Sequence, residues 1–136
     1  MNRAKDIIYM IFSESYNSDH FSFMPNIKPA ESGLPYWTMI RDKDQVHNLH
    51  DATVKVFKER PGVSDSVSFY VLTGDIDKKV KNNNFLSNSE ERQVQQWIRL
   101  NRDLILKYWY TDIAEEKFRS DMTKWSKENI KNIPSW

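Results

Sequence analysis

The alternation of hydrophobic and polar residues predicts two short strands in the first half of the chain. Residues 36–41 place Trp37 and Met39 on one face and their neighbours on the other. Residues 66–73 alternate more clearly, and Gly74 ends the run. The hydrophobic face of this second strand would consist of Val67, Phe69 and Val71.

Helical spacing of apolar residues predicts a helix between these two strands. Apolar positions recur at i, i+3 and i+4 spacings from residue 46 to residue 57, and Asp44 is a suitable N-cap. Pro61 and Gly62 would end the helix. The inward positions would be Val46, Leu49, Thr53, Val56 and Phe57.

The longest amphipathic stretch follows Ser87, which forms a capping box with Glu90 three residues later. One helical face then carries Val94, Trp97, Ile98, Asn101, Leu104, Ile105 and Trp109. A further helix is predicted from about residue 111 or 112 to a point before Pro134. Its inward positions would be Ala114, Phe118, Met122 and Trp125.

Two N-terminal segments carry weaker patterns. Residues 4–12 fit a helical stripe, which we favour slightly because it includes Ala4, but the same run also suits a buried strand. Residues 16–35 show no period and contain three prolines and Gly33, so we predict a long loop, a feature that is often functional.

Together these elements predict a single α+β domain over residues 1–136. We expect a small antiparallel sheet of two or three strands packed against two to four helices, including a long amphipathic C-terminal helix. Strands and helices do not alternate regularly as they do in parallel βαβ folds. A chain of 136 residues can bury a sizeable core without metal ions or disulfides.

Composition excludes several classes of function. The formal net charge is +1, which does not point to nucleic acid, and there is no cysteine to form a disulfide or bind metal. With three glycines the chain has no phosphate-binding loop, and we expect no cofactor. The first apolar run is too short for a signal peptide, and no stretch approaches the ~20 residues of a membrane span. We therefore expect a cytoplasmic protein without a membrane partner.

The three histidines are the first candidates for site chemistry. His47 and His50 would share a helix face and could hold a metal, but the i, i+4 spacing with an intervening Glu found in zinc helices is absent. We interpret both as polar residues of an amphipathic helix. His20 follows Asp19, which could orient it as a general base, although adjacent side chains diverge. We interpret this pair as polar loop residues.

Two surface features of the longest helix suggest binding. Arg92, Arg99 and Arg102 would lie along one flank, where they could contact phosphates, unless they simply form a solvated face. Tyr108 and Tyr110 flank the inward Trp109, so a helix cannot bury all three rings and part of this pair is expected to be exposed. Exposed tyrosines are common in partner-binding surfaces.

The segment from Gln96 to Trp109, followed by Ile113, resembles the C-terminal helix of small prokaryotic and phage proteins of unknown function, some encoded in toxin–antitoxin-like pairs. That pattern consists of a Trp, an Asn or His, paired Leu and a closing Trp. Many of these proteins also carry Asp-His followed by prolines and a second His. Asp19 and His20 match the start of that motif, but no second His follows here.

Three functional hypotheses follow. The first is a protein–protein interaction module without its own catalytic site, such as an adaptor, antitoxin-like or phage-accessory protein, acting through a partner protein or a second copy. It is favoured because the sequence has no catalytic motif, is rich in aromatics and is nearly neutral. The second is an RNA-binding toxin or metal-independent ribonuclease that uses His20 and the arginines. The third is a structural subunit of a larger assembly.

Overall fold

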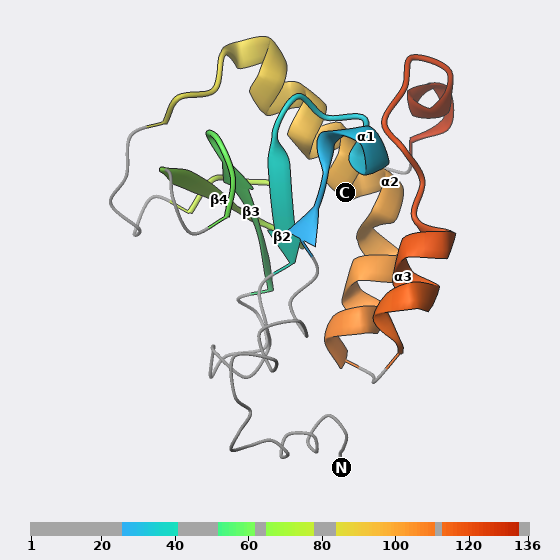
Figure 1. Cartoon of the computed structure of the whole chain (residues 1–136). Helices are drawn as coiled ribbons and strands as arrows, with labels where there is room; N and C mark the ends of the chain where they lie inside the picture. The colour runs from blue at the N-terminus through green and yellow to red at the C-terminus, as the bar shows by residue number, and fades with distance from the viewer. Residues whose placement is uncertain (1–25, 41–51, 62–64, 78–83, 111–112, 134–136) are drawn as a thin grey trace, which may run out of the picture.

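Four strands form one antiparallel sheet in the order β1-β2-β3-β4 within the residues described by the computed structural model, 26–40, 52–61, 65–77, 84–110 and 113–133. They are β1 (Asn26–Ile27), β2 (Trp37–Ile40), β3 (Thr53–Phe57) and β4 (Ser66–Tyr70). The long helix α2 (Asn88–Tyr110) packs on one face of this sheet (Figure 1). The predicted α+β class is confirmed, with four strands in place of two or three.

Three short elements complete the described structure. Helix α1 (Pro29–Ser32) connects β1 to β2, and helix α3 (Glu115–Asp121) follows α2. The 3-10 helix η5 (Asn129–Asn132) lies close to the end of the chain. None of the helices in the described ranges is both long enough and apolar enough to cross a membrane.

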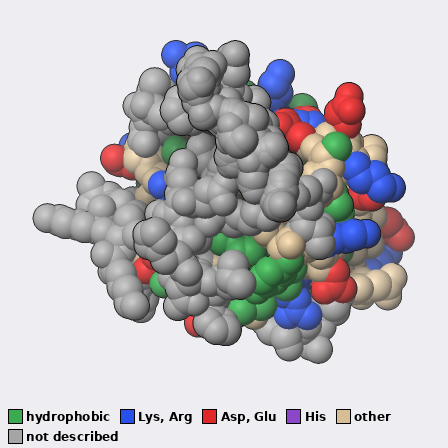
Figure 2. All heavy atoms as spheres, turned by 90° about the horizontal axis from the view of Figure 1, so that it is seen from below, with side chains coloured by type: hydrophobic (Ala, Val, Ile, Leu, Met, Phe, Trp, Pro, Cys, Tyr) green, Lys and Arg blue, Asp and Glu red, His purple; other side chains and the backbone are tan. Residues whose placement is uncertain are grey.

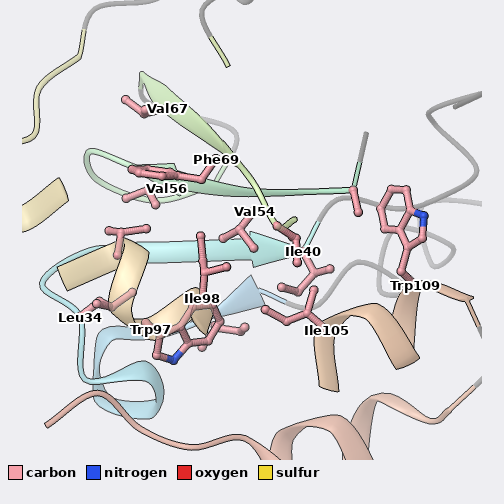
Figure 3. Close-up of a cluster of buried hydrophobic side chains, with 14 of the residues drawn as sticks. Leu34, Ile40, Val54, Val56, Val67, Phe69, Trp97, Ile98, Ile105 and Trp109 are labelled. Atoms are coloured by element: carbon pink, nitrogen blue, oxygen red, sulfur yellow. The ribbon is translucent and has the colours of Figure 1, made fainter. Parts of the chain in front are cut away.

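The hydrophobic core lies between the sheet and α2 (Figure 3). Val54 pairs with Phe69 and Val56 pairs with Val67, so these four side chains point to the same face of the sheet. All four are fully buried. From α2, the buried apolar side chains are Val94, Trp97, Ile98, Ile105 and Trp109.

Strands β2 and β4 and helix α2 lie where they were predicted, although β4 ends at Tyr70 and residues 71–73 form a turn. In β2, Thr38 and Ile40 are buried, whereas Trp37 and Met39 on the opposite face are half-buried. The Ser87 hydroxyl accepts a hydrogen bond from Glu90 N, and the Glu90 carboxylate accepts one from Ser87 N, which confirms the capping box. Every predicted inward position of α2 is buried except Leu104, which packs against the core while partly exposed.

The predicted helix between the strands is wrong for its second half, because residues 53–57 form β3. Thr53, Val54 and Val56 are β-branched and suit a strand, and both faces of β3 are covered. A strand buried on two sides produces a nearly continuous apolar run, which contains helical spacings by coincidence. The first half of the predicted helix, including His47 and His50, lies outside the described residues.

The predicted loop over residues 16–35 contains regular structure in its second half. Pro29 stands in the first turn of α1, where its missing N–H is not needed, and Gly33 ends the helix with φ = 82°. The proline and glycine that suggested a loop are thus the boundary residues of a one-turn helix. The first part of the loop and the ambiguous segment 4–12 lie outside the described residues.

The last predicted helix is much shorter than expected. Helix α3 ends at Asp121, and Met122 adopts an extended conformation, with φ = −67° and ψ = 136°. Phe118 is buried as predicted, and Met122 and Trp125 pack against the core while partly exposed, but they do so outside a helix. Ala114, predicted to face inward, is exposed.

Candidate partner-binding surface

Helix α2 carries all the candidate site residues that the structure describes. With 3.6 residues per turn, its side chains divide into three surfaces. The first packs on the sheet through residues such as Ile98 and Ile105. The second faces residues 113–133, here called the C-terminal segment. The third, the outward flank, consists of Arg92, Arg99, Asp103, Leu106 and Tyr110.

The N-terminal end of α2 is fixed by a polar cluster around Glu90. The Tyr36 hydroxyl lies 3.3 Å from both carboxylate oxygens of Glu90, and its ring meets Phe85 edge to face at 5.2 Å between centroids. Burial and the neighbouring Glu90 carboxylate raise the pKa of Tyr36 above its ordinary value. These contacts join the first turn of α2 to the start of β2 and so orient the whole helix.

The structure brings two arginines of the predicted stripe, Arg92 and Arg99, onto the same flank as Tyr110. Arg92 and Tyr110 are eighteen residues apart, which is five turns, so they lie on one line along the helix. Arg92 is exposed, whereas Arg99 and Arg102 are partly buried and already engaged by neighbouring groups. Arg102 lies at the border between this flank and the sheet side. The Gln95 amide donates a 3.0 Å hydrogen bond to the carbonyl oxygen of Gly74, which anchors this side of α2 to the turn after β4.

The two candidate tyrosines have different environments. Tyr108 is half-buried against the C-terminal segment, and its ring centroid lies 5.3 Å from that of Phe118. Tyr110 projects from the outward flank with 48% of its surface exposed. Figure 2 views the molecule from below, the side on which α2 ends in Figure 1, and shows hydrophobic side chains next to charged ones on this face. Tyr110 is therefore the more accessible of the two rings.

All three histidines lie outside the described residues, so the structure does not place the candidate base His20 or the candidate metal ligands His47 and His50. In the described part of the chain, no group of three or more His, Cys, Asp or Glu side chains could hold a metal ion. The arrangement that the structure does provide is a helix flank with guanidinium donors and an accessible phenol ring, which suits binding.

Sequence reasoning missed the polar residues that hold the C-terminal segment. Asn101 is 2% exposed, and its side chain bonds to the backbone of Thr123. Gln96 accepts a hydrogen bond from the Trp125 indole. The available signal was an Asn within an otherwise apolar helical stripe, since a buried amide requires hydrogen-bond partners.

Comparisons with protein-family models, with curated proteins and with solved structures find no match to this chain. The resemblance of the α2 segment to small prokaryotic and phage proteins therefore stays a prediction.

Proposed function

We propose that this chain is a protein–protein interaction module and that the outward flank of α2 is its contact surface. The observation that carries the proposal is the exposure of Tyr110 at the end of that flank. Among the large hydrophobic side chains in the described ranges, Leu72 and Tyr110 are the exposed ones, at 39% and 48%. Tyrosine is enriched among the residues that dominate binding energy, because its ring offers apolar area and its hydroxyl a polar contact.

The surroundings of Tyr110 support this proposal. Leu106 lies one turn before it and packs against the core, and its exposed part adds to the apolar area. Arg99 lies further along the same flank. Asp103 is exposed between them. Protein interfaces commonly combine an aromatic or aliphatic centre with a polar rim, and arginine is enriched in them. The adaptor, antitoxin-like and phage-accessory roles are all compatible with such a surface, which makes no demand for a catalytic site.

Affinity capture from host lysate with three full-length proteins tests the proposal. The proteins are the wild type, Tyr110→Ala and, as a matched control, Leu72→Ala, which removes the other exposed hydrophobic side chain. We expect a protein captured at near-stoichiometric level by the wild type and by Leu72→Ala, and about tenfold less of it with Tyr110→Ala. Equal capture by all three proteins would contradict the assignment of this flank.

Sedimentation of the purified proteins adds a second arm to this test. If the partner is another copy of the chain, the wild type should dimerise with rising concentration and Tyr110→Ala should not. A wild-type protein that captures nothing and stays monomeric at high concentration would exclude both the interaction module and the structural-subunit hypothesis.

RNA binding is a second candidate function, favoured by the position of Arg92 and Arg99 on the same flank as Tyr110. Guanidinium groups that contact phosphates, together with an aromatic ring that stacks on bases, are typical of single-strand binding sites. Retention of RNA at low salt and its release as salt rises would support this function. A ribonuclease activity using His20 is a separate hypothesis, and it would be wrong if His20→Ala cleaved RNA as well as the wild type.

A further inference from the structure

After α3, the chain leaves the helical conformation and runs alongside α2 and past α1 (Figure 1). Hydrogen bonds from two distant parts of the chain hold it there. Asn101 and Gln96 of α2 contribute their side chains, and Ser32 contributes its backbone carbonyl. We call Ser32, Gly33, Gln96 and Asn101 the docking site, and residues 122–126 the docked segment.

Asn101 holds the docked segment in the way that a neighbouring strand would. Its Nδ2 donates a 2.9 Å hydrogen bond to the carbonyl oxygen of Thr123, and its Oδ1 accepts a 2.7 Å hydrogen bond from the amide of the same residue. Nδ2 also donates to the Trp97 carbonyl of α2 at 2.9 Å, which fixes the orientation of the amide. Since both contacts to Thr123 involve backbone atoms, they would accept almost any residue at that position.

Two positions further along, the docking site contacts Trp125 at both its backbone and its side chain. The Trp125 amide donates a 2.7 Å hydrogen bond to the Ser32 carbonyl, and its indole Nε1 donates one of 2.9 Å to Gln96 Oε1. Gly33 lies directly beneath the Trp125 backbone, where a Cβ atom would collide with the Trp125 carbonyl oxygen. The lack of a side chain at Gly33 therefore makes room for a second backbone.

No side chain of the docked segment is fully buried, although Met122 and Trp125 pack against the core. Met122 and Trp125 are partly exposed, and η5, which follows, contains no buried residue. Segments held by a few hydrogen bonds and little apolar burial open locally at low cost, without unfolding of the core. The docking site can thus become vacant while the sheet and α2 remain folded.

From this geometry we propose that the docking site is a binding site for an extended peptide of a partner protein, and that the chain's own residues 122–126 occupy it when no partner is bound. The partner peptide pairs one backbone residue with Asn101 and carries a tryptophan two positions later, whose indole reaches Gln96. This site is separate from the outward flank of α2, so the inference does not depend on the function proposed above.

Intramolecular occupation makes the site hard to detect in the native protein. A tethered segment acts at an effective concentration in the millimolar range, so a free peptide of equal intrinsic affinity competes poorly with it. Loosening the chain's own segment should therefore strengthen binding of the peptide in trans. A segment that leaves its site only when the core unfolds would give no such gain.

The experiment uses a fluorescein-labelled synthetic peptide with the sequence of residues 120–129 and the full-length chain. Thr123→Pro removes the N–H that donates to Asn101, and Trp125→Ala removes the indole that donates to Gln96. Fluorescence anisotropy should show at least about tenfold tighter peptide binding by either variant than by the wild type. Circular dichroism verifies that the variant measured is folded, and having two independent variants covers a failure of one to fold.

Two controls decide the result. Adding Asn101→Ala to the Thr123→Pro chain should abolish the gained affinity, and a peptide with Ala in place of its tryptophan should bind at least about tenfold more weakly. Gained affinity that disappears with both changes supports the proposal. A folded Thr123→Pro or Trp125→Ala chain that binds the peptide no better than the wild type overturns it, as does a gain that survives Asn101→Ala.

Discussion

The core between the sheet and α2 and the C-terminal segment are held in place by different kinds of contact. In the core, apolar side chains such as Phe69, Trp97 and Ile98 are fully buried from water. In the C-terminal segment, Phe118 is the buried hydrophobic side chain, and hydrogen bonds to Asn101, Gln96 and Ser32 provide further attachment. Apolar burial is non-directional and proportional to area, whereas each hydrogen bond depends on the exact placement of two atoms.

This difference has a consequence for stability. Loss of a core side chain should reduce the free energy of unfolding of the whole described structure. Loss of a polar contact in the C-terminal segment should mainly change the local opening of that segment. Substitutions that separate these two effects test whether the regions are independent.

The largest effect is expected for Trp97→Ala. The Trp97 side chain is fully buried between the sheet and α2, so its removal should lower the free energy of unfolding by about 3–5 kcal/mol. Urea denaturation followed by circular dichroism measures this loss. Leu72→Ala, at an exposed position, is the control and should change stability by less than about 0.5 kcal/mol. A similar loss in both proteins would show that Trp97 is not part of the buried core.

Gly33→Ala should have the next largest effect, and it acts on the C-terminal segment. Gly33 has φ = 82°, where a side chain costs about 1–2 kcal/mol, and the new Cβ would push away the Trp125 backbone. The associated loss of the hydrogen bond from Trp125 to Ser32 adds about 1 kcal/mol. In a hydrogen-exchange experiment, the Trp125 amide should exchange faster in the variant than in the wild type. The amides of β3 and β4 should keep the same relative order of exchange rates in both proteins. Unchanged exchange at Trp125 would mean that the segment does not rest on Gly33.

Asn101→Ala should lower the free energy of unfolding by about 2 kcal/mol, because it leaves the buried Trp97 carbonyl and the part-buried backbone groups of Thr123 with one hydrogen-bond partner fewer. Exchange of the Thr123 amide reports this loss directly. Asn101→Asp keeps an oxygen that accepts from Thr123 N, but it replaces the Nδ2 donor with a second oxygen that would lie against the carbonyl oxygens of Trp97 and Thr123. The Thr123 amide should therefore exchange at least as fast in Asn101→Asp as in Asn101→Ala, and slower exchange in Asn101→Asp would argue against the two-bond geometry.

The contrast between the two regions also explains which features the sequence predicted. Periodicity identified β2, β4 and α2, because residues of one type recur on one face of each element. It failed for β3, whose two faces are both covered. It also overextended α3, because Met122 and Trp125 continue a helical spacing although hydrogen bonds hold them in a non-helical segment.

The candidate site shows the same contrast between features that local periodicity predicts and contacts that it does not. Helical geometry was sufficient to group Arg92 with Arg99 and to indicate that part of the Tyr108 and Tyr110 pair is exposed. The separation of these two rings depends on Phe118 of α3, which packs against Tyr108 in a tertiary contact that the geometry of α2 alone does not predict. The docking site was not predictable, because it joins Gly33 and Asn101 through a backbone approach that leaves no periodic pattern.

The smallest effect is expected from an ion pair at the start of the C-terminal segment. Arg119 donates to Glu31 at 2.8 Å, to Glu115 at 2.7 Å and to the Asn26 carbonyl at 2.8 Å, and so joins α3 to α1 and β1. Burial acts to raise the pKa of Glu31, but the hydrogen bond from Lys28 N and the Arg119 guanidinium outweigh it, so the pKa is lowered overall. About a third of the Glu31 side chain is exposed, which limits the contribution to less than about 1 kcal/mol.

Because the pKa of Glu31 is lower in the folded protein, ionised Glu31 favours the folded state. That stabilisation is fully present above the ordinary pKa of 4.5 and is lost as the pH falls through the lower folded-state value. Glu31→Gln should therefore be less stable than the wild type at pH 7, and the difference should shrink as the pH falls below 4.5. Thermal unfolding between pH 7 and pH 3 measures it, with Glu116→Gln, an exposed neighbour on α3, as the control. A difference that stays constant with pH would show that the Gln variant loses packing and not charge, so the ion pair would contribute nothing to holding the C-terminal segment.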